Sequence, residues 1–205
     1  PYHFIINKSF WQIFNGTFRV NYQNYYVSAL LTRRFMVQFT RFKINFNGEI
    51  MDLRNYYGDK ADEKVLLARI EKVKKAFFTH EKVKPERLFS SSGRAEILGN
   101  HTDHNHGKVL VAAISCDILA AVKKTDDGVI KICSDGYLPF TLSVDDLAAR
   151  ENEKGTTIAL TRGVAAAIKN RGEKIGGFTA YLTSNVFGGA GVSSSAAYEV
   201  LIAEI

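Results

Sequence analysis

A glycine- and serine-rich turn, FGGAGVSSSAAYEV (residues 187–200), limits most strongly what this chain can fold into. It follows GGFTAYLTSNV, which reads as a β-strand, and it leads into an apolar stretch typical of a helix. Gly188, Gly189 and Gly191 permit backbone conformations that other residues avoid. The free N–H groups at the start of a helix attract anions. A strand, a glycine turn and a helix in this order therefore predict a phosphate site.

The serines of this turn favour the same interpretation. The hydroxyls of Ser193, Ser194 and Ser195 can hydrogen-bond phosphate oxygens or complete the shell of a magnesium ion. The turn lacks the G-K-[ST] ending of a Walker A loop, and it is not a GxGxxG dinucleotide fingerprint. An alternative stays open, because a turn of small residues can also serve only close packing, with a serine as the N-cap.

The remaining pattern predicts an α+β fold. A helix is expected over residues 59–78, with one apolar face that carries Leu66, Ile70, Val73 and Phe77. A second helix is expected over 156–172, closed by Arg171-Gly172. The tripeptide Asp126-Asp127-Gly128 predicts a hairpin between two strands. Further strands are expected at RLF, KVLVAAI, FTLSVDDL and GGFTAYLTSNV, the last with Phe178, Tyr181 and Leu182 in the core.

A second polar region, GRAEILGNHTDHNHG (residues 93–107), is expected to form a loop between apolar segments. Arg94 carries a permanent charge on a planar fork that suits phosphate or carboxylate. The polar set that suits a polyhydroxylated ligand comprises Asn100, His101, Asp103 and Asn105. Two alternatives are weaker: a solvated polar turn, and a zinc site built on His101, His104 and His106 with Asp103, for which no further ligand cluster is evident.

Charge is concentrated at the N-terminus. Residues 1–50 hold six basic residues and one acidic residue, which leaves 21 basic against 20 acidic for the rest of the 27 and 21 in the chain. The body is thus near neutral, which argues against a nucleic-acid partner. Within residues 1–50, no apolar run is long enough to cross a membrane. The basic, aromatic segment 1–50 could stack on nucleic acid or lie on a membrane, but we expect that it is not native coding sequence. Cys116 and Cys133 are expected to be buried thiols of a cytoplasmic protein.

The two polar regions together resemble a known family. GRAEILGNHTDHNHGKVLVAAI (residues 93–114) is similar to the galactokinase signature G-R-x-N-x-I-G-E-H-x-D-Y, and GGAGVSSSAA (residues 188–197) is similar to the G-x-G-[LV]-S-S-S-A motif of the GHMP small-molecule kinases. The resemblance covers roughly residues 60–205. It implies the α+β N-terminal domain of a GHMP kinase (ribosomal protein S5 domain 2-like) over 87–205, preceded by a helical segment over 51–86.

The resemblance also implies a reaction, the ATP- and Mg²⁺-dependent phosphorylation of galactose at its anomeric hydroxyl. It implies that Arg94 is catalytic and contacts the substrate, and that Asn100, His101 and Asp103 bind the sugar. The nucleotide phosphates would be bound by Gly189, Gly191, Ser193 and Ser194, and magnesium by Ser195. The complete protein is expected to be a cytoplasmic monomer.

The sequence departs from the family pattern in several places. Asn100 stands where the family has Glu, Glu96 where it has Asn, and His104 where it has Tyr, so a related hexose, or a sugar- and nucleotide-binding sensor without catalysis, stays open. The family's catalytic aspartate, second magnesium carboxylate and C-terminal domain follow the serine motif. We therefore expect this chain to be an N-terminal fragment that is inactive by itself.

Overall fold

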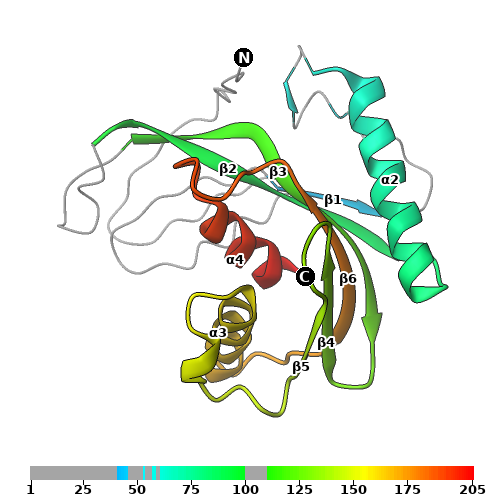
Figure 1. Ribbon diagram of the computed structural model, residues 1–205, viewed down its shortest axis with the longest axis vertical. Coiled ribbons are helices and arrows are strands. Elements are labelled where there is room, and N and C mark those ends of the chain that lie inside the picture. The colour runs from blue at the N-terminus through cyan, green and yellow to red at the C-terminus, as the bar shows by residue number, and fades with distance from the viewer. Residues whose placement is uncertain (1–40, 46–52, 54–56, 59–60, 100–109) are drawn as a thin grey trace.

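The computed structural model describes residues 41–45, 53, 57–58, 61–99 and 110–205 (Figure 1). These residues form one six-stranded sheet with helices on both faces. This mixed architecture confirms the α+β prediction. The elements in chain order are β1 (Arg41–Asn45), α2 (Glu63–Glu81), β2 (Arg87–Leu98), β3 (Leu110–Thr125), β4 (Val129–Ser134), β5 (Phe140–Ser143), a 3₁₀ turn (Glu151–Glu153), α3 (Thr157–Asn170), β6 (Gly177–Ser184) and α4 (Ser194–Glu204).

The strands lie in the order β1-β2-β3-β6-β4-β5. All neighbours are antiparallel except β4 and β6, which run parallel with Ile130 opposite Phe178. The predicted hairpin at residues 126–128 is therefore wrong. The chain does turn there, with Gly128 at φ +66°, but β3 and β4 are not paired, because β6 lies between them.

The start of β6 shows how the two strands are held apart. Gly177 lies against the turn so closely that a Cβ would be 2.6 Å from Asp127 Oδ1, 2.6 Å from Thr125 Oγ1 and 2.8 Å from the Val129 nitrogen. Asp127 itself accepts hydrogen bonds from Thr125 Oγ1 and from the Val129 N–H. The turn thus has the local chemistry of a hairpin, while a strand about 50 residues later in sequence takes the pairing position.

Two apolar clusters cover the two faces of the sheet. One face packs against α2 through Ile70, Val73 and Phe77, which are buried as predicted, with Leu66 partly buried beside them. The other face packs against α3 and α4, whose buried residues include Val164, Ala197 and Leu201. Phe178 and Leu182 of β6 are buried here, while Tyr181 packs against the α2 cluster. Figure 1 shows α2 on one side of the sheet and the other two helices on the opposite side.

Three predicted boundaries change. The helix expected over 59–78 begins after the N-cap Asp62, whose carboxylate accepts the N–H groups of Lys64 and Val65, and it continues to Glu81. The two apolar runs around Ile114 and Ile118 form one strand of 16 residues, β3. Residues 93–98, expected in a loop, lie on β2. Pairing with β3 holds this segment, which includes Gly93, Arg94 and Glu96, in a strand that its composition alone does not predict.

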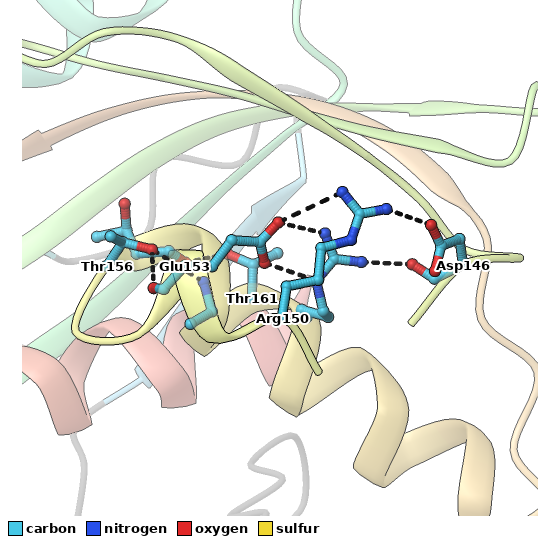
Figure 2. A network of polar contacts seen from close by, with 8 residues as sticks. Asp146, Arg150, Glu153, Thr156 and Thr161 are labelled. Atoms are coloured by element: carbon cyan, nitrogen blue, oxygen red, sulfur yellow. Dashed lines mark hydrogen bonds and ion pairs between the residues drawn. The ribbon is translucent and has the colours of Figure 1, made fainter. Parts of the chain in front are cut away.

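The segment between β5 and α3 is held by a polar network (Figure 2). Arg162, 4% exposed, donates from Nε and Nη2 to the two carboxylate oxygens of Glu153, both at 2.7 Å. Its Nη1 donates to the Asp146 carbonyl, and Arg150 pairs with the carboxylates of both Asp146 and Glu153. This bidentate geometry fixes the approach of the chain to α3, whose N-cap is Thr156.

Candidate active site

The glycine–serine turn connects the end of β6 to the start of α4, as predicted. Gly189 and Gly191 have φ angles of +77° and +71°, in the left-handed region that favours glycine. A Cβ at either position would meet nothing within 4 Å. Among the described residues, these glycines are thus required by backbone conformation and not by close packing. The turn leaves room over its surface.

The serine hydroxyls make no capping hydrogen bond to α4. Ser193 has the N-cap position of α4, but its φ is +60° and its hydroxyl makes no capping hydrogen bond. Within the described part of the chain, no hydrogen bond engages the side chains of Ser194 or Ser195 either. Ser193 thus lies at the N-cap position, as the packing-and-capping alternative expects, but without the side-chain hydrogen bond of a serine cap. Three hydroxyls and the unpaired N–H groups of the first helical turn are available to an anionic group.

Arg94 lies next to this turn although it is about 100 residues away in sequence. Its backbone N–H donates to the carbonyl of Val192, the residue before Ser193, at 3.1 Å. The register of β2 against β3 shifts between Ser92 and Arg94, and such bulges re-aim side chains. The two polar regions found in the sequence therefore meet at one hydrogen bond.

Gly93 makes this close approach possible. A Cβ at this position would be 2.9 Å from the Val192 carbonyl oxygen, 3.2 Å from Ile114 Cδ1 and 3.2 Å from Val186 Cγ1. Only glycine leaves room for the backbone of the turn to lie against β2. The glycine that precedes Arg94 thus has a packing role, which sequence reasoning did not identify.

The charges at this place favour an anion. Arg94 is partly buried as a residue, and no side chain of the described residues pairs with its guanidinium. The start of α4 adds the positive end of a helix dipole. The backbone of Arg94 lies beside this helix start, and an arginine fork that reaches the same place can hold phosphate oxygens and neutralise charge that develops during phosphoryl transfer.

The other predicted sugar contacts, Asn100, His101 and Asp103, lie outside the described residues, as do His104 and His106 of the alternative zinc site. Where the structure describes the chain, no three His, Cys, Asp or Glu side chains gather as metal ligands. Across the same residues, no helix is long and apolar enough to span a membrane. Cys133 is buried and Cys116 partly buried, and both are free thiols.

Sequence reasoning missed a buried carboxylate beside the turn. Asp117 of β3 is 2% exposed and hydrogen-bonds to Tyr57. Burial, together with the charge of Asp117, raises the pKa of the Tyr57 hydroxyl far above its ordinary value, so the phenol stays a donor. The available signal was an aspartate in the middle of the apolar run ISCDILAA, because an unpaired charge is rarely buried.

Comparison with known proteins agrees with this arrangement. Residues 75–124 match the family model described as the galactokinase galactose-binding signature. This range includes Arg94 and all the predicted sugar contacts. The chain resembles galactokinases. It is 38% identical over 121 residues to galactokinase of Streptomyces coelicolor, covering 58% of this chain and 31% of that protein. It is 31% identical over 121 residues to galactokinase of Lacticaseibacillus casei, with the same coverage.

A solved galactokinase has the same fold over this region. The structure of Lactococcus lactis galactokinase complexed with galactose matches with a TM-score of 0.56 and 27% identity, over 67% of this chain and 35% of that one. The mixed α/β fold of this chain is thus that of the solved galactokinase over part of its length. The chain spans about a third of the length of the galactokinases it matches.

Proposed function

We propose that this chain contributes the nucleotide-phosphate and sugar-binding half of an ATP-dependent galactokinase. The reaction would transfer the γ-phosphoryl group of ATP to the anomeric hydroxyl of galactose. The observation that carries the proposal is the hydrogen bond from Arg94 to Val192, because it brings the galactokinase signature to the serine turn. The proposal is further supported by the similarity to galactokinases over 58% of the chain.

The described residues fit a bound triphosphate. The open space over Gly189 and Gly191 lets the phosphates approach the backbone. Ser193 and Ser194, whose hydroxyls have no partner among the described residues, would donate to phosphate oxygens. Ser195, exposed on the first turn of α4, would offer one oxygen to magnesium. When bound, MgATP supplies the phosphoryl group and the metal charge that offsets its negative oxygens.

Arg94 would be the catalytic residue of this half. Its guanidinium would hold the reacting hydroxyl and the transferring phosphoryl group together, and it would offset the charge on the equatorial oxygens. Asn100, His101 and Asp103 would orient the sugar, with Asp103 accepting from ring hydroxyls. In this chemistry positioning and charge neutralisation supply most of the rate.

The family's catalytic aspartate follows the serine motif in the galactokinase pattern. We therefore propose that residues 1–205 alone bind ligands without turnover. The complete protein is proposed to work in the cytoplasm as a monomer, and the two free thiols suit a reducing compartment.

Calorimetric titration of the chain with MgATP tests the phosphate half. Replacing Ser194 by alanine should weaken binding about tenfold, because a hydrogen bond to a charged oxygen is lost. Ser143→Ala is the matched control, since Ser143 lies opposite Val129 at the start of β4. Because β4 and β6 run parallel, the start of β4 lies beside the start of β6, whereas the turn follows the other end of β6. Equal affinities for both variants would contradict the assignment.

A coupled ADP-release assay tests the reaction on the reading frame extended past residue 205. Turnover with galactose supports the kinase, and Arg94→Ala should abolish most of it. Asn100, which replaces an acidic residue of the family pattern, favours a second candidate, a sugar sensor without catalysis. Galactose binding without ADP release from the folded, extended protein would support that candidate and exclude the first.

A further inference from the structure

The carboxylate of Asp117 is a junction between three parts of the chain. It is 2% exposed, and a buried charge is costly unless it is paired and hydrogen-bonded. The Tyr57 hydroxyl donates to its Oδ2 at 2.6 Å, the Ser90 hydroxyl donates to the same oxygen, and the Arg69 guanidinium donates to Oδ1. The donors come from α2, from β2 and from the segment before α2, so the carboxylate is fully satisfied.

The backbone of Asp117 binds the residue at which the chain leaves the sheet. The ladder between β3 and β6 pairs residues up to Ile118 opposite Ser184. At the next position, the Asp117 N–H donates to the side-chain oxygen of Asn185 at 2.6 Å, and the Asn185 N–H donates to the Asp117 carbonyl at 3.1 Å. The Asn185 side chain thus replaces a backbone carbonyl of the ladder. The backbone of the turn is free to diverge while its first residue stays attached.

Arg69 holds both strands at this point. Besides the carboxylate, its Nη2 donates to the Asp117 carbonyl at 3.1 Å and to the Thr183 carbonyl at 3.3 Å. One guanidinium therefore contacts β3 and β6 where the turn begins. Arg69 belongs to the face of the sheet that α2 covers, whereas the turn leads to α4 on the other face. The contacts of Arg69 on the α2 face of the sheet therefore hold the start of a turn that leads to α4 on the opposite face.

We propose that Arg69, Asp117 and Asn185 are positioning residues for the glycine–serine turn. They set the place and direction in which residues 186–193 leave β6, so that the Val192 carbonyl reaches the Arg94 N–H. Val186 continues the attachment, because it exchanges two hydrogen bonds with the Ser184 hydroxyl and is buried. The binding of phosphate by this turn rests on the proposed function. The positioning of the turn by these residues does not depend on that function.

Amide hydrogen exchange resolved by NMR tests the positioning without any ligand. The reporters are the N–H groups of Val186 and Arg94, and their rates are divided by those of amides within β6. Asn185→Ala removes one acceptor and leaves the buried ion pair intact. It should raise this ratio about fivefold, the effect of losing one hydrogen bond. Arg69→Lys should change the ratio in the same direction, because an ammonium lacks the planar fork that spans both strands.

Val73→Ala is the matched control for a purely structural role. Val73 is 1% exposed on α2 and packs in the same cluster as Tyr57. Its side chain takes no part in the hydrogen bonds around Asp117 and Asn185. Its truncation should speed exchange throughout the sheet and leave the ratio unchanged. The proposal is overturned if Asn185→Ala leaves the ratio at the wild-type value, or if Val73→Ala raises it equally.

A parallel titration with MgATP separates this inference from the proposed function. A wild-type chain that binds no MgATP would refute the phosphate assignment, while the exchange ratio would still decide the positioning. If the wild type binds, Asn185→Ala should bind several-fold more weakly, and Val73→Ala should bind with wild-type affinity at temperatures where it is folded. Equal binding by Asn185→Ala would show that the attachment does not position the turn for its ligand.

Discussion

The contact between Gly93 and Val192 makes a sharp prediction for the substitution Gly93→Ala. The added Cβ would be 2.9 Å from the Val192 carbonyl oxygen and 3.2 Å from both Ile114 and Val186. The carbonyl cannot retreat without lengthening its bond from the Arg94 N–H, now 3.1 Å. Overpacking of this kind costs about 1–3 kcal/mol, and weakening the hydrogen bond adds about 1 kcal/mol. Alanine returns only about 0.5 kcal/mol by restricting the unfolded chain.

The net loss of about 2 kcal/mol should lower the melting temperature by roughly 4–8 °C for a chain of this size. Gly163→Ala is the matched control, because Gly163 lies within α3 and a Cβ there would meet nothing within 4 Å. That variant should gain up to about 1 kcal/mol from helix propensity. Urea unfolding followed by circular dichroism measures both. If Gly93→Ala is as stable as Gly163→Ala, the close approach of the turn to β2 is wrong.

Further predictions concern groups away from the turn. The pKa of Glu153 is lowered, chiefly by its hydrogen bonds from Arg162, so the unfolded chain binds more protons in acid. The stability from this pair is present above pH 4.5, the ordinary pKa of a glutamate, and is lost as the pH falls below it. Glu153→Gln should therefore reduce the pH dependence of the urea unfolding midpoint in that acid range. Burial raises the pKa of the Cys133 thiol, so iodoacetamide at pH 7.5 should modify it slowly until urea unfolds the chain. Tyr198→Phe removes a buried 2.8 Å hydrogen bond to Thr161 and should cost about 1 kcal/mol by the same unfolding assay.

The elements whose signals are local could be predicted from the sequence. The helix α2 has its apolar face and its N-cap aspartate within one continuous stretch, and the strand, glycine turn and helix of residues 177–204 follow one another directly. For these, periodicity and turn chemistry determine the structure. The helix ends at Glu81, three residues later than predicted, where Lys82 adopts a left-handed C-cap conformation. A lysine in the sequence does not predict such a cap.

The errors came from pairing between distant residues. The tripeptide at 126–128 does form a turn of the kind found in hairpins, yet β6, which begins at Gly177, lies between β3 and β4. No local sequence pattern indicates that a strand from later in the chain will pair between two consecutive strands. Arg94 was expected in a loop because its neighbours are polar, but pairing to Ala113 keeps it on β2. The binding roles of Arg94 and of the serines stay predictions, while the backbone hydrogen bond from Arg94 to Val192, the residue before Ser193, is observed.

The turn is attached at both ends and open between them, and this arrangement bears on how it can act. At its start, Asn185 is bonded to Asp117; at its end, Val192 is bonded to Arg94 and pressed against Gly93. Between these points the turn is open, because a Cβ placed at Gly189 or Gly191 would have no atom within 4 Å. Fixed ends lower the entropy that a ligand must remove when it orders the turn, and the glycines keep the surface free for close approach. Since the second attachment is the backbone of Arg94 itself, any shift of the turn changes the distance between its hydroxyls and the guanidinium. Loss of either attachment should therefore weaken the binding of a phosphate ligand and also change the distance between the turn and Arg94, which stays paired on β2, whereas loss of a serine hydroxyl should affect binding alone.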